Sequence, residues 1–251
     1  MAGYKETPRQ KMIGMMYLVL TALLALNVSK DILNAFVIVN EGLKTSQTNV
    51  SSKNDLIYMN FDKASMENPV KVKPYLDNAL KAKAIADSLS SYIKNLRTRV
   101  IAYTEFKVKD KNKDPEIWAI ADTISLADIQ AKDNYDMPME ILIGGTEDGS
   151  KGEGIVLKNK LAKFKTDMLA LLKDENDKKA VEKNFPFKLD DTYSITEGKT
   201  VDWVRNNFFH TVLAADVALL NKMLIDVKTV EGDVIAKLYA NVDASSFKFD
   251  K

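Results

Sequence analysis

The chain has 251 residues, of which 46% are hydrophobic and 28% charged, a balance typical of a folded protein. Its 36 basic and 35 acidic side chains leave a net charge of +1, so it lacks the basic field of nucleic-acid-binding proteins, and we expect no nucleic-acid partner. The absence of cysteine excludes disulfides, thiolate catalysis and thiolate metal ligands, and with His210 as the only histidine the chain cannot by itself build a histidine-rich zinc or iron site. Carboxylate sites for harder metals stay open but have no supporting pattern, so we expect no metal site and no cofactor.

The first predicted element is a transmembrane helix over residues 11–30. From Met12 to Ser29 the chain has no charged residue, and as a helix this stretch reaches about 27 Å, close to the thickness of a hydrocarbon core. Lys11 and Lys30, with Arg9 beside them, can extend to the two interfaces as anchors. The alternative is a cleaved signal peptide. However, the apolar run is longer than a signal core, and "LALNVSKDIL" after it offers no A-x-A cleavage pattern, so we expect a retained helix.

The orientation of this helix follows from the charges that precede it. Lys5, Arg9 and Lys11 come before the apolar run and are opposed only by Glu6. Basic residues favour the cytoplasmic side of a membrane. We therefore expect residues 1–10 to form a short cytoplasmic tail of a single-pass protein in a bacterial inner membrane, with the bulk of the chain in the periplasm.

One face of the predicted membrane helix carries small and hydroxylated residues at spacings of three and four. These residues are Gly14, Tyr17, Thr21, Ala25 and Val28. Small residues on one stripe let a second helix approach closely in lipid, so the stripe predicts a packing face. The alternative is an ordinary anchor in which these residues share a face by chance.

The apolar stripe continues beyond the membrane segment, which predicts a single helix that leaves the membrane. The stripe consists of Ile32, Leu33, Phe36, Val37, Val39 and Leu43. Such a rigid exit can transmit torque or displacement, whereas a flexible linker would dissipate it. The polar run "TSQTNVSSKND" that follows is either a loop or a polar turn of the same helix.

The remaining elements predict a helical bundle over residues 31–240. Pro69 and Pro74 indicate a break, after which a helix begins near Tyr75, and a short helix surrounds Trp118. The core-facing residues of the first of these helices are Leu76, Leu80, Leu89, Ile93, Leu96, Val100 and Tyr103.

Two further helical patterns lie in the second half of the chain. The first consists of Leu157, Leu161, Phe164, Met168 and Leu171, and the second is a long helix from Val201 to Tyr239. Only "MPMEILIGG" and "TYSITEG" indicate extended chain. The expected fold class is therefore mainly α, with one N-terminal transmembrane helix followed by a periplasmic helical bundle.

A glycine-rich loop in "EILIGGTEDGSKGEGIVLKNKL" offers the strongest signal for catalysis. Gly144 and Gly149 have the spacing of a phosphate-binding loop, but Ser150 and Lys151 stand in the reverse of the required order. The acidic Glu147 and its neighbour would also repel phosphate. We interpret the segment as a solvated turn.

His210, in "NNFFHTVL", is interpreted as a structural or interface residue on a helix. No spacing in the chain marks a catalytic site, so we assign no catalytic residue and expect the protein not to be an enzyme.

The opening segment carries a resemblance to a known family. "TPRQKMIGMMYLVLTALLALNVSK", followed by "ILNAF…NEGL", closely resembles the N-terminus of the GldM family, also called PorM, of the gliding and type IX secretion machinery. "FFHTVLAADVALLNKMLIDVKTVEGDVI" resembles the last long helix of that family's first periplasmic domain. The resemblance implies a membrane helix plus first domain, with residues 241–251 as the start of a linker to β domains that lie outside this sequence.

The resemblance also implies partners and a role for one residue. Members of the family dimerise, insert their helices through a ring of the inner-membrane protein GldL, and connect to further periplasmic and outer-membrane components. Arg9 is similar to the family's arginine that faces an intramembrane glutamate of GldL. A guanidinium favours the ionised carboxylate and loses that attraction when the carboxylate is protonated, so the pair can act as a proton-controlled latch. The alternative for Arg9 is plain anchoring to lipid phosphates.

The expected function is therefore a motor subunit that couples the proton-motive force, through the partner ring, to movement of a dimeric periplasmic shaft. The first alternative is a single-pass sensor or adaptor with a helical ligand-binding bundle, against which stands a cytoplasmic tail too short for an output domain. A membrane-anchored periplasmic hydrolase is the third class.

Overall fold

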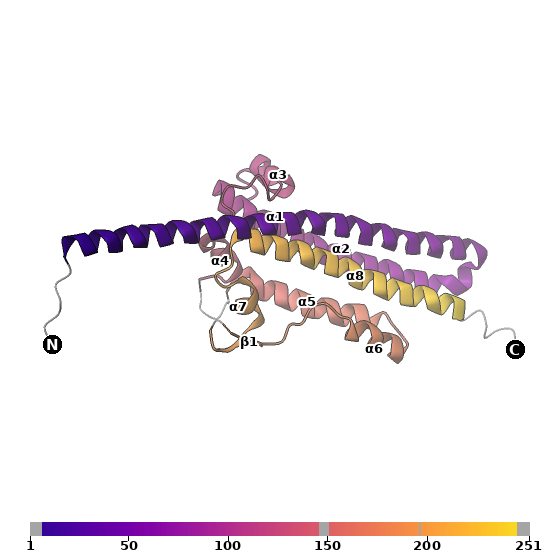
Figure 1. Ribbon diagram of the computed structural model, residues 1–251. Coiled ribbons are helices and arrows are strands. Elements are labelled where there is room, and N and C mark those ends of the chain that lie inside the picture. The colour runs from indigo at the N-terminus through magenta and orange to yellow at the C-terminus, as the bar shows by residue number, and fades with distance from the viewer. Residues whose placement is uncertain (1–6, 146–150, 196, 245–251) are drawn as a thin grey trace.

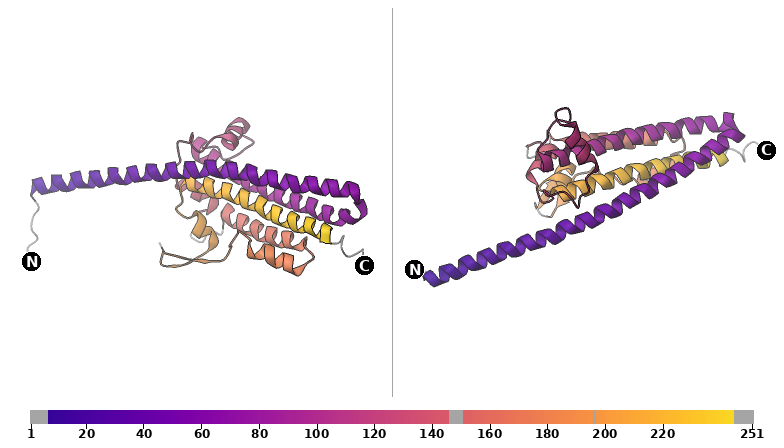
Figure 2. Two further views of the ribbon diagram at one scale, coloured as in Figure 1. Left: turned by 45° about the vertical axis from the view of Figure 1, so that its right-hand side comes forward. Right: turned by 90° about the horizontal axis from the view of Figure 1, so that it is seen from above.

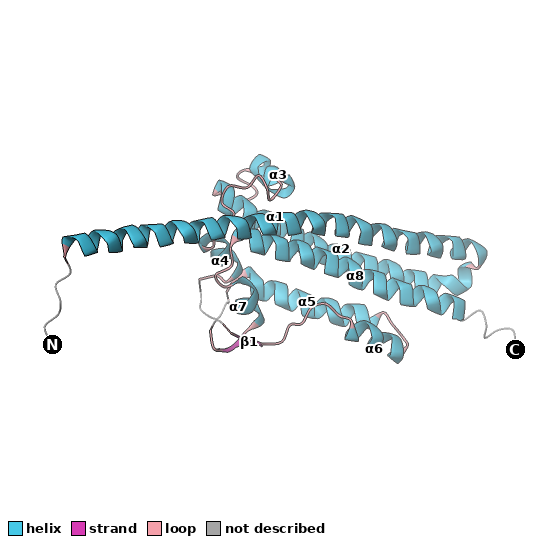
Figure 3. Cartoon of the chain, viewed as in Figure 1, coloured by secondary structure: helices cyan, strands magenta, loops and turns pink. Residues whose placement is uncertain are grey.

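The computed structural model describes residues 7–145, 151–195 and 197–244, without the side chains of 23–29 and 243–244. It is mainly helical, which confirms the predicted fold class at that level (Figures 1 and 3). Three long helices lie side by side and form the frame of the molecule (Figures 1 and 2). They are α1 (Pro8–Glu67), α2 (Pro69–Phe106) and α8 (Leu213–Ala244).

Helix α1 begins at a capping box. The Thr7 hydroxyl accepts a hydrogen bond from the Gln10 amide, the Gln10 side chain accepts one from the Thr7 amide at 3.0 Å, and Pro8 occupies the first helical position. The polar run at residues 45–55 belongs to the same helix, so the helical alternative for this segment is confirmed. Side chains up to residue 32 are exposed wherever they are described, and the first that packs on the bundle is Leu33. The first part of α1 therefore projects beyond the bundle (Figure 1).

Helix α2 starts earlier than the sequence predicts. The Asn68 side chain accepts a hydrogen bond from the Lys71 amide at 3.3 Å, and Pro69 follows as the first helical residue. The predicted start near Tyr75 is wrong because the asparagine cap and the favoured N-terminal proline outweigh Pro74, which lies within the helix. Most of the predicted core face is buried, but Leu80 is half exposed.

Helices α1 and α8 run parallel to each other. Asn40 pairs with Asn221, the Asn54 side chain donates to the Lys228 carbonyl, and the Phe61 ring meets Tyr239 edge-on. From one contact to the next the residue numbers increase on both helices, so the two helices point in the same direction (Figure 2). The core lies between these helices and α2, with α5 on the outer side of α2.

The smaller elements pack around these three helices. They are α3 (Pro115–Thr123), α4 (Asp136–Leu142), α5 (Glu153–Ala170), α6 (Glu175–Lys183), β1 (Thr192–Ser194), β2 (Lys199–Val201) and α7 (Trp203–Phe208). The two strands form an antiparallel hairpin in which Thr192 faces Val201. The predicted helices around Trp118 and from Leu157 are confirmed, and so is extended chain at "TYS".

Two predicted elements are wrong. "MPMEIL" was expected as extended chain but forms α4, because Pro138 falls in the first turn of a helix, where a missing amide costs nothing. The expected helix from Val201 to Tyr239 is interrupted. Asp202 caps α7, which ends at Phe208, and the chain then turns through His210 at φ 54° before α8 begins. His210 is therefore in a connection and not on a helix.

Candidate functional site

The projecting end of α1 carries the predicted basic anchors. Arg9 is the second residue of the helix, and both Arg9 and Lys11 are exposed. Lys30 is exposed on the same helix, where it lines a shallow groove of about 210 Å³ with Leu33 and Lys132. The structure thus leaves all three cations accessible at the positions where an interface or a partner could meet them.

The predicted packing face is also accessible where it is described. A Cβ atom added to Gly14 would meet nothing within 4 Å, and Tyr17 is 69% exposed. The Thr21 hydroxyl donates to the carbonyls of Tyr17 at 3.0 Å and Leu18 at 2.9 Å, so its hydrogen-bonding needs are met within the helix. Such a threonine presents its methyl group to a neighbour without an unmet donor. The predicted face also includes Ala25 and Val28, whose side chains lie outside the described residues.

The exposed apolar side chains of α1 occupy every side of the helix. Each of the following is more than half exposed: Met12, Ile13, Met15, Met16, Tyr17, Leu18, Val19 and Leu20. A helix that is apolar all round is typical of a segment covered by lipid or by other protein. In the part of the chain that the structure describes, no helix combines the length and apolar character that crossing a membrane requires.

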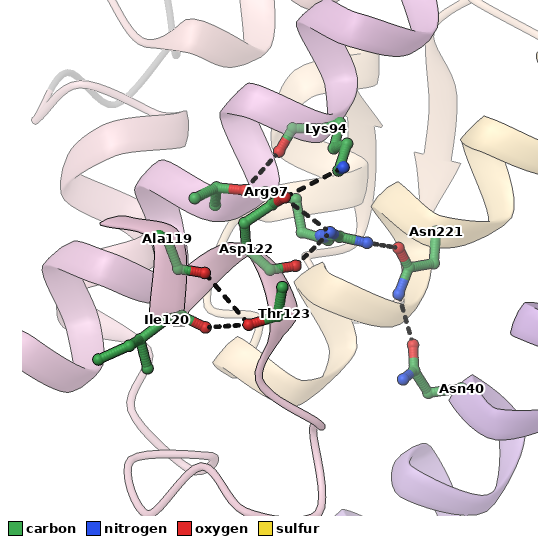
Figure 4. Close-up of polar contacts among 9 residues, drawn as sticks. Asn40, Lys94, Arg97, Ala119, Ile120, Asp122, Thr123 and Asn221 are labelled. Atoms are coloured by element: carbon green, nitrogen blue, oxygen red, sulfur yellow. Dashed lines mark hydrogen bonds and ion pairs between the residues drawn. The ribbon is translucent and has the colours of Figure 1, made fainter. Parts of the chain in front are cut away.

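A polar network joins α1 to the bundle close to the point where the helix leaves it (Figure 4). Asn40 is buried, and its Oδ1 accepts a hydrogen bond from Asn221 Nδ2 on α8 at 2.6 Å. Arg97 on α2 donates from one terminal nitrogen to Asn221 Oδ1 at 2.7 Å and from the other to the Asp122 carbonyl at 3.1 Å. The network therefore ties α1, α8, α2 and α3 together at a single level of the bundle.

Charge pairing holds Asp122 in its ionised form. Lys94 Nζ lies 3.0 Å from its carboxylate, and the Thr98 hydroxyl donates to it at 2.8 Å. Burial alone would raise the pKa of Asp122, but the hydrogen bonds from Lys94 and Thr98, with the nearby Arg97 charge, hold it below its usual value. Burial also lowers the pKa of Arg97, against the effect of Asp122. The ion pairs of Asp122 on α3 with Lys94 and Arg97 on α2 thus hold the two helices together.

A second polar cluster lies further along α1 and α8. Glu231 is almost completely buried, accepts a hydrogen bond from Tyr58 at 2.8 Å, and pairs with Lys228 at 2.8 Å. Lys228 also lies 2.6 Å from Asp87 on α2. Burial, and then the Glu231 charge, raises the pKa of Tyr58 well above its usual value, so the phenol remains a donor. Burial would lower the pKa of Lys228, but its two carboxylate partners raise it.

His210 packs beside aromatic rings, and the described ends of the glycine-rich segment approach each other through their backbones. The His210 ring lies 4.2 Å from that of Phe209 and 6.0 Å from that of Tyr135, measured between centroids. Gly144 has φ 79°, and a Cβ there would lie 2.5 Å from Gly152 N, so the loop is closed by backbone contact. Gly149, Ser150 and the acidic pair before them lie outside the described residues. Among those described, no three His, Asp or Glu side chains are grouped as metal ligands.

The sequence did not reveal either polar cluster. Asn40 and Glu231 each stand within apolar helical stripes, and a polar residue at a core-facing position is the only signal that could have indicated them. Each has a partner on a helix more than a hundred residues away in the chain, Asn221 for Asn40 and Tyr58 for Glu231.

Comparison with known proteins gives one family. Residues 31–241 match the family model described as the GldM N-terminal domain. A search of curated proteins gives no match.

Proposed function

This chain belongs to the GldM N-terminal domain family of the gliding and type IX secretion machinery, and on that premise we propose that it is a motor subunit in the inner membrane. In this proposal residues 11–30 cross the membrane inside a GldL-like ring, two copies of the chain associate, and the bundle lies in the periplasm. Proton flow through the ring moves α1, and the bundle carries that movement outward. The chain itself performs no chemical reaction.

The observation that carries the proposal is the continuity of α1. One helix runs from Pro8 to Glu67, about 90 Å long, with exposed apolar side chains in its first part and packed ones in its second. Any rotation or displacement of the projecting end therefore reaches the bundle without passing through a loop. The polar network at Asn40 then fixes the helix to α2, α3 and α8 at once.

Arg9 is the proposed contact with the partner's glutamate. It is exposed, is the second residue of α1, and is followed two residues later by Lys11, which is also exposed. An ion pair at a membrane interface is strengthened by the low dielectric, and protonation of the carboxylate ends it. Each proton that crosses the potential supplies about 2.3 kcal/mol per 100 mV to such a cycle.

The test is co-purification of the full chain with the ring protein in mild detergent, with subunits counted by native mass spectrometry. We expect two copies of this chain within a larger ring, and loss of the complex when residues 1–30 are deleted. Arg9→Ala should keep the complex but abolish gliding and secretion, whereas the matched control Lys11→Ala should retain both.

Two outcomes would contradict the proposal. If a monomeric chain purifies without any partner that depends on residues 1–30, the segment is only an anchor and the sensor or adaptor alternative is favoured. If Arg9→Ala moves and secretes as the wild type does, Arg9 has no part in energy coupling.

A further inference from the structure

The β1–β2 hairpin carries two exposed apolar side chains that the proposed motor cycle does not use. Ile195 is 92% exposed and Tyr193 is 63% exposed. Tyr193 pairs across the hairpin with Thr200, and directly opposed residues of an antiparallel pair share one face of the sheet. Ile195 follows Tyr193 by two residues, just after the end of β1. We call Tyr193, Ile195 and Thr200 the hairpin face, and all three are exposed and uncharged.

Other residues of the hairpin fix it on the bundle. Arg205 Nε, on α7, donates to both carboxylate oxygens of Glu197, at 2.8 and 3.0 Å. The Arg205 guanidinium also lies 3.7 Å from the centre of the Phe209 ring. Val201, at the end of β2, is buried. These contacts hold the hairpin against α7 and leave the hairpin face uncovered.

The hairpin lies at the end of the bundle from which α1 projects (Figures 1 and 2). The level of this end follows from the parallel course of α1 and α8. Asn40 on α1 meets Asn221 on α8. Leu213, the first residue of α8, comes eight residues before Asn221, and Ile32 comes eight residues before Asn40. The bundle therefore ends at about the level of Ile32, just beyond the membrane segment 11–30 that we propose.

This level decides what the hairpin face can meet. A single exposed isoleucine is ordinary on a protein surface in water. At a membrane boundary, however, a tyrosine ring is favoured among the headgroups, and an aliphatic side chain is stabilised when it leaves water for the acyl chains. The charges of the hairpin are already paired, Glu197 with both Arg205 and Lys199. A contact with lipid would therefore depend on apolar burial and not on anionic headgroups.

From the exposed hairpin face, its attachment and its level, we propose that Tyr193 and Ile195 dip into the periplasmic surface of the lipid bilayer. This inference rests on the proposed membrane segment. Figure 1 shows the hairpin apart from α1, so the bundle would touch the membrane at a second point. Two points of contact oppose tilting of the bundle, whereas a fluid lipid surface lets it turn. The contact is thus compatible with the proposed movement of α1.

The test measures the depth of single nitroxide labels on the full chain in nanodiscs of phosphatidylcholine. Depth is obtained from collisions with oxygen, which enters lipid, and with a water-soluble nickel complex. Because the chain has no cysteine, Thr200→Cys places one label beside Tyr193 and keeps both apolar side chains. Leu18→Cys reports on the membrane segment, and Val70→Cys, 87% exposed at the far end of the bundle, reports on water.

We expect the label at residue 200 to lie about 5–10 Å inside the boundary between headgroups and acyl chains. The label at residue 18 should lie deeper, and the label at residue 70 should be fully accessible to the nickel complex. Raising the salt concentration should not change these depths, because the contact does not depend on charge.

A matched pair of substitutions identifies the side chain that makes the contact. Ile195→Asp, in the Thr200→Cys chain, should bring the label out of the lipid, because a carboxylate is costly to remove from water. Val70→Asp makes a similar change at another highly exposed apolar residue and should leave the depth at residue 200 unchanged. Circular dichroism checks that both variants remain folded.

The labels separate failure of this inference from failure of the proposed function. If the nickel complex reaches the label at residue 18, residues 11–30 do not cross the membrane, and both fail. If the label at residue 18 lies in lipid and the label at residue 200 in water, only this inference fails.

Two further results would overturn the lipid contact. An unchanged depth at residue 200 in Ile195→Asp would show that another part of the bundle meets the membrane. A label at residue 200 that lies in lipid for the chain alone, but is shielded from oxygen in the co-purified complex, would show that the ring protein covers the hairpin face in the motor.

Discussion

Asp216 lies fully buried in the first turn of α8. Its Oδ1 accepts a hydrogen bond from the Thr211 hydroxyl at 2.6 Å, and its Oδ2 has no partner among the described residues. Burial raises the pKa of Asp216 to about 8, and the Thr211 hydrogen bond only partly opposes this. The folded protein therefore keeps this proton at neutral pH, whereas the unfolded chain releases it near the ordinary value of 3.8.

The first prediction concerns the pH dependence that follows. Because the folded state holds the proton more tightly, Asp216 contributes stability that is complete below pH 3.8 and is lost as the pH rises to about 8. Asp216→Asn should therefore flatten the fall in the free energy of unfolding between about pH 5 and 8. Urea unfolding at several pH values measures this slope. Asp77→Asn, at an exposed position, is the control, and a wild-type slope in Asp216→Asn would contradict the prediction.

The second prediction concerns the buried charge of Glu231. Lys228→Met should destabilise the bundle by about 3 kcal/mol, because it leaves a buried carboxylate with only the Tyr58 hydrogen bond. Lys222→Met, which breaks a lysine–aspartate pair on the same helix at a more exposed lysine, should cost less than about 1 kcal/mol. Chemical denaturation measures the free energy of unfolding of both variants. Equal losses of stability would contradict the prediction, because they would show that buried Glu231 does not depend on Lys228.

Helix α1 as an element gives the third prediction. Ala35 is exposed close to the level at which the helix reaches the bundle. Ala35→Pro removes one helical hydrogen bond and bends the helix there, at a cost of about 3 kcal/mol. Ala35→Gly costs about 1 kcal/mol and leaves the helix continuous. In the proposed motor, the proline variant should still assemble with the ring but fail in gliding and secretion. The readouts are co-purification and colony spreading, and normal spreading by Ala35→Pro would show that a stiff exit is unnecessary.

The sequence predicted helices well where one apolar face repeats without interruption. The helix from Leu157 has five core positions at regular spacing, and four of them are buried as expected. It failed at boundaries set by capping, because Asn68 starts α2 before Pro74 and Asp202 starts a separate α7. The break at His210 depends on Thr211 and on the carbonyls of Lys132 and Asn134, which accept from the first amides of α8. No local pattern contains those tertiary contacts.

In the candidate site, too, one part could be predicted from the sequence and another could not. The projecting segment with Arg9, Gly14 and Tyr17 could be read from the sequence because it is continuous and apolar, and its membrane role stays a prediction. The network of Asn40, Asn221 and Arg97 could not, since it forms only when three helices are in register. Hydrogen bonds between helices that are far apart in the chain are the part of the site that the sequence pattern does not predict.

At the scale of the whole molecule, the core extends from Leu33 to Val242, so the fourth prediction is that residues 31–251 fold without the projecting segment. This fragment should be helical by circular dichroism and should unfold cooperatively. A fragment of residues 46–251 loses the contacts of Leu33, Phe36 and Val37 and the Asn40 bond, and should be less stable by about 3 kcal/mol. Equal stability of the two fragments would mean that α1 contributes little at the exit.

The parallel course of α1 and α8 has a mechanical consequence. The described chain enters the bundle through α1 at one end and leaves it through α8 at the other (Figure 1). Tension between these ends pulls the two helices past each other along their common axis, so the contacts from Asn40–Asn221 to Phe61–Tyr239 are loaded in shear and must yield together. An antiparallel pair pulled from adjacent ends would instead open one contact at a time. The fold is thus arranged to bear traction along its length.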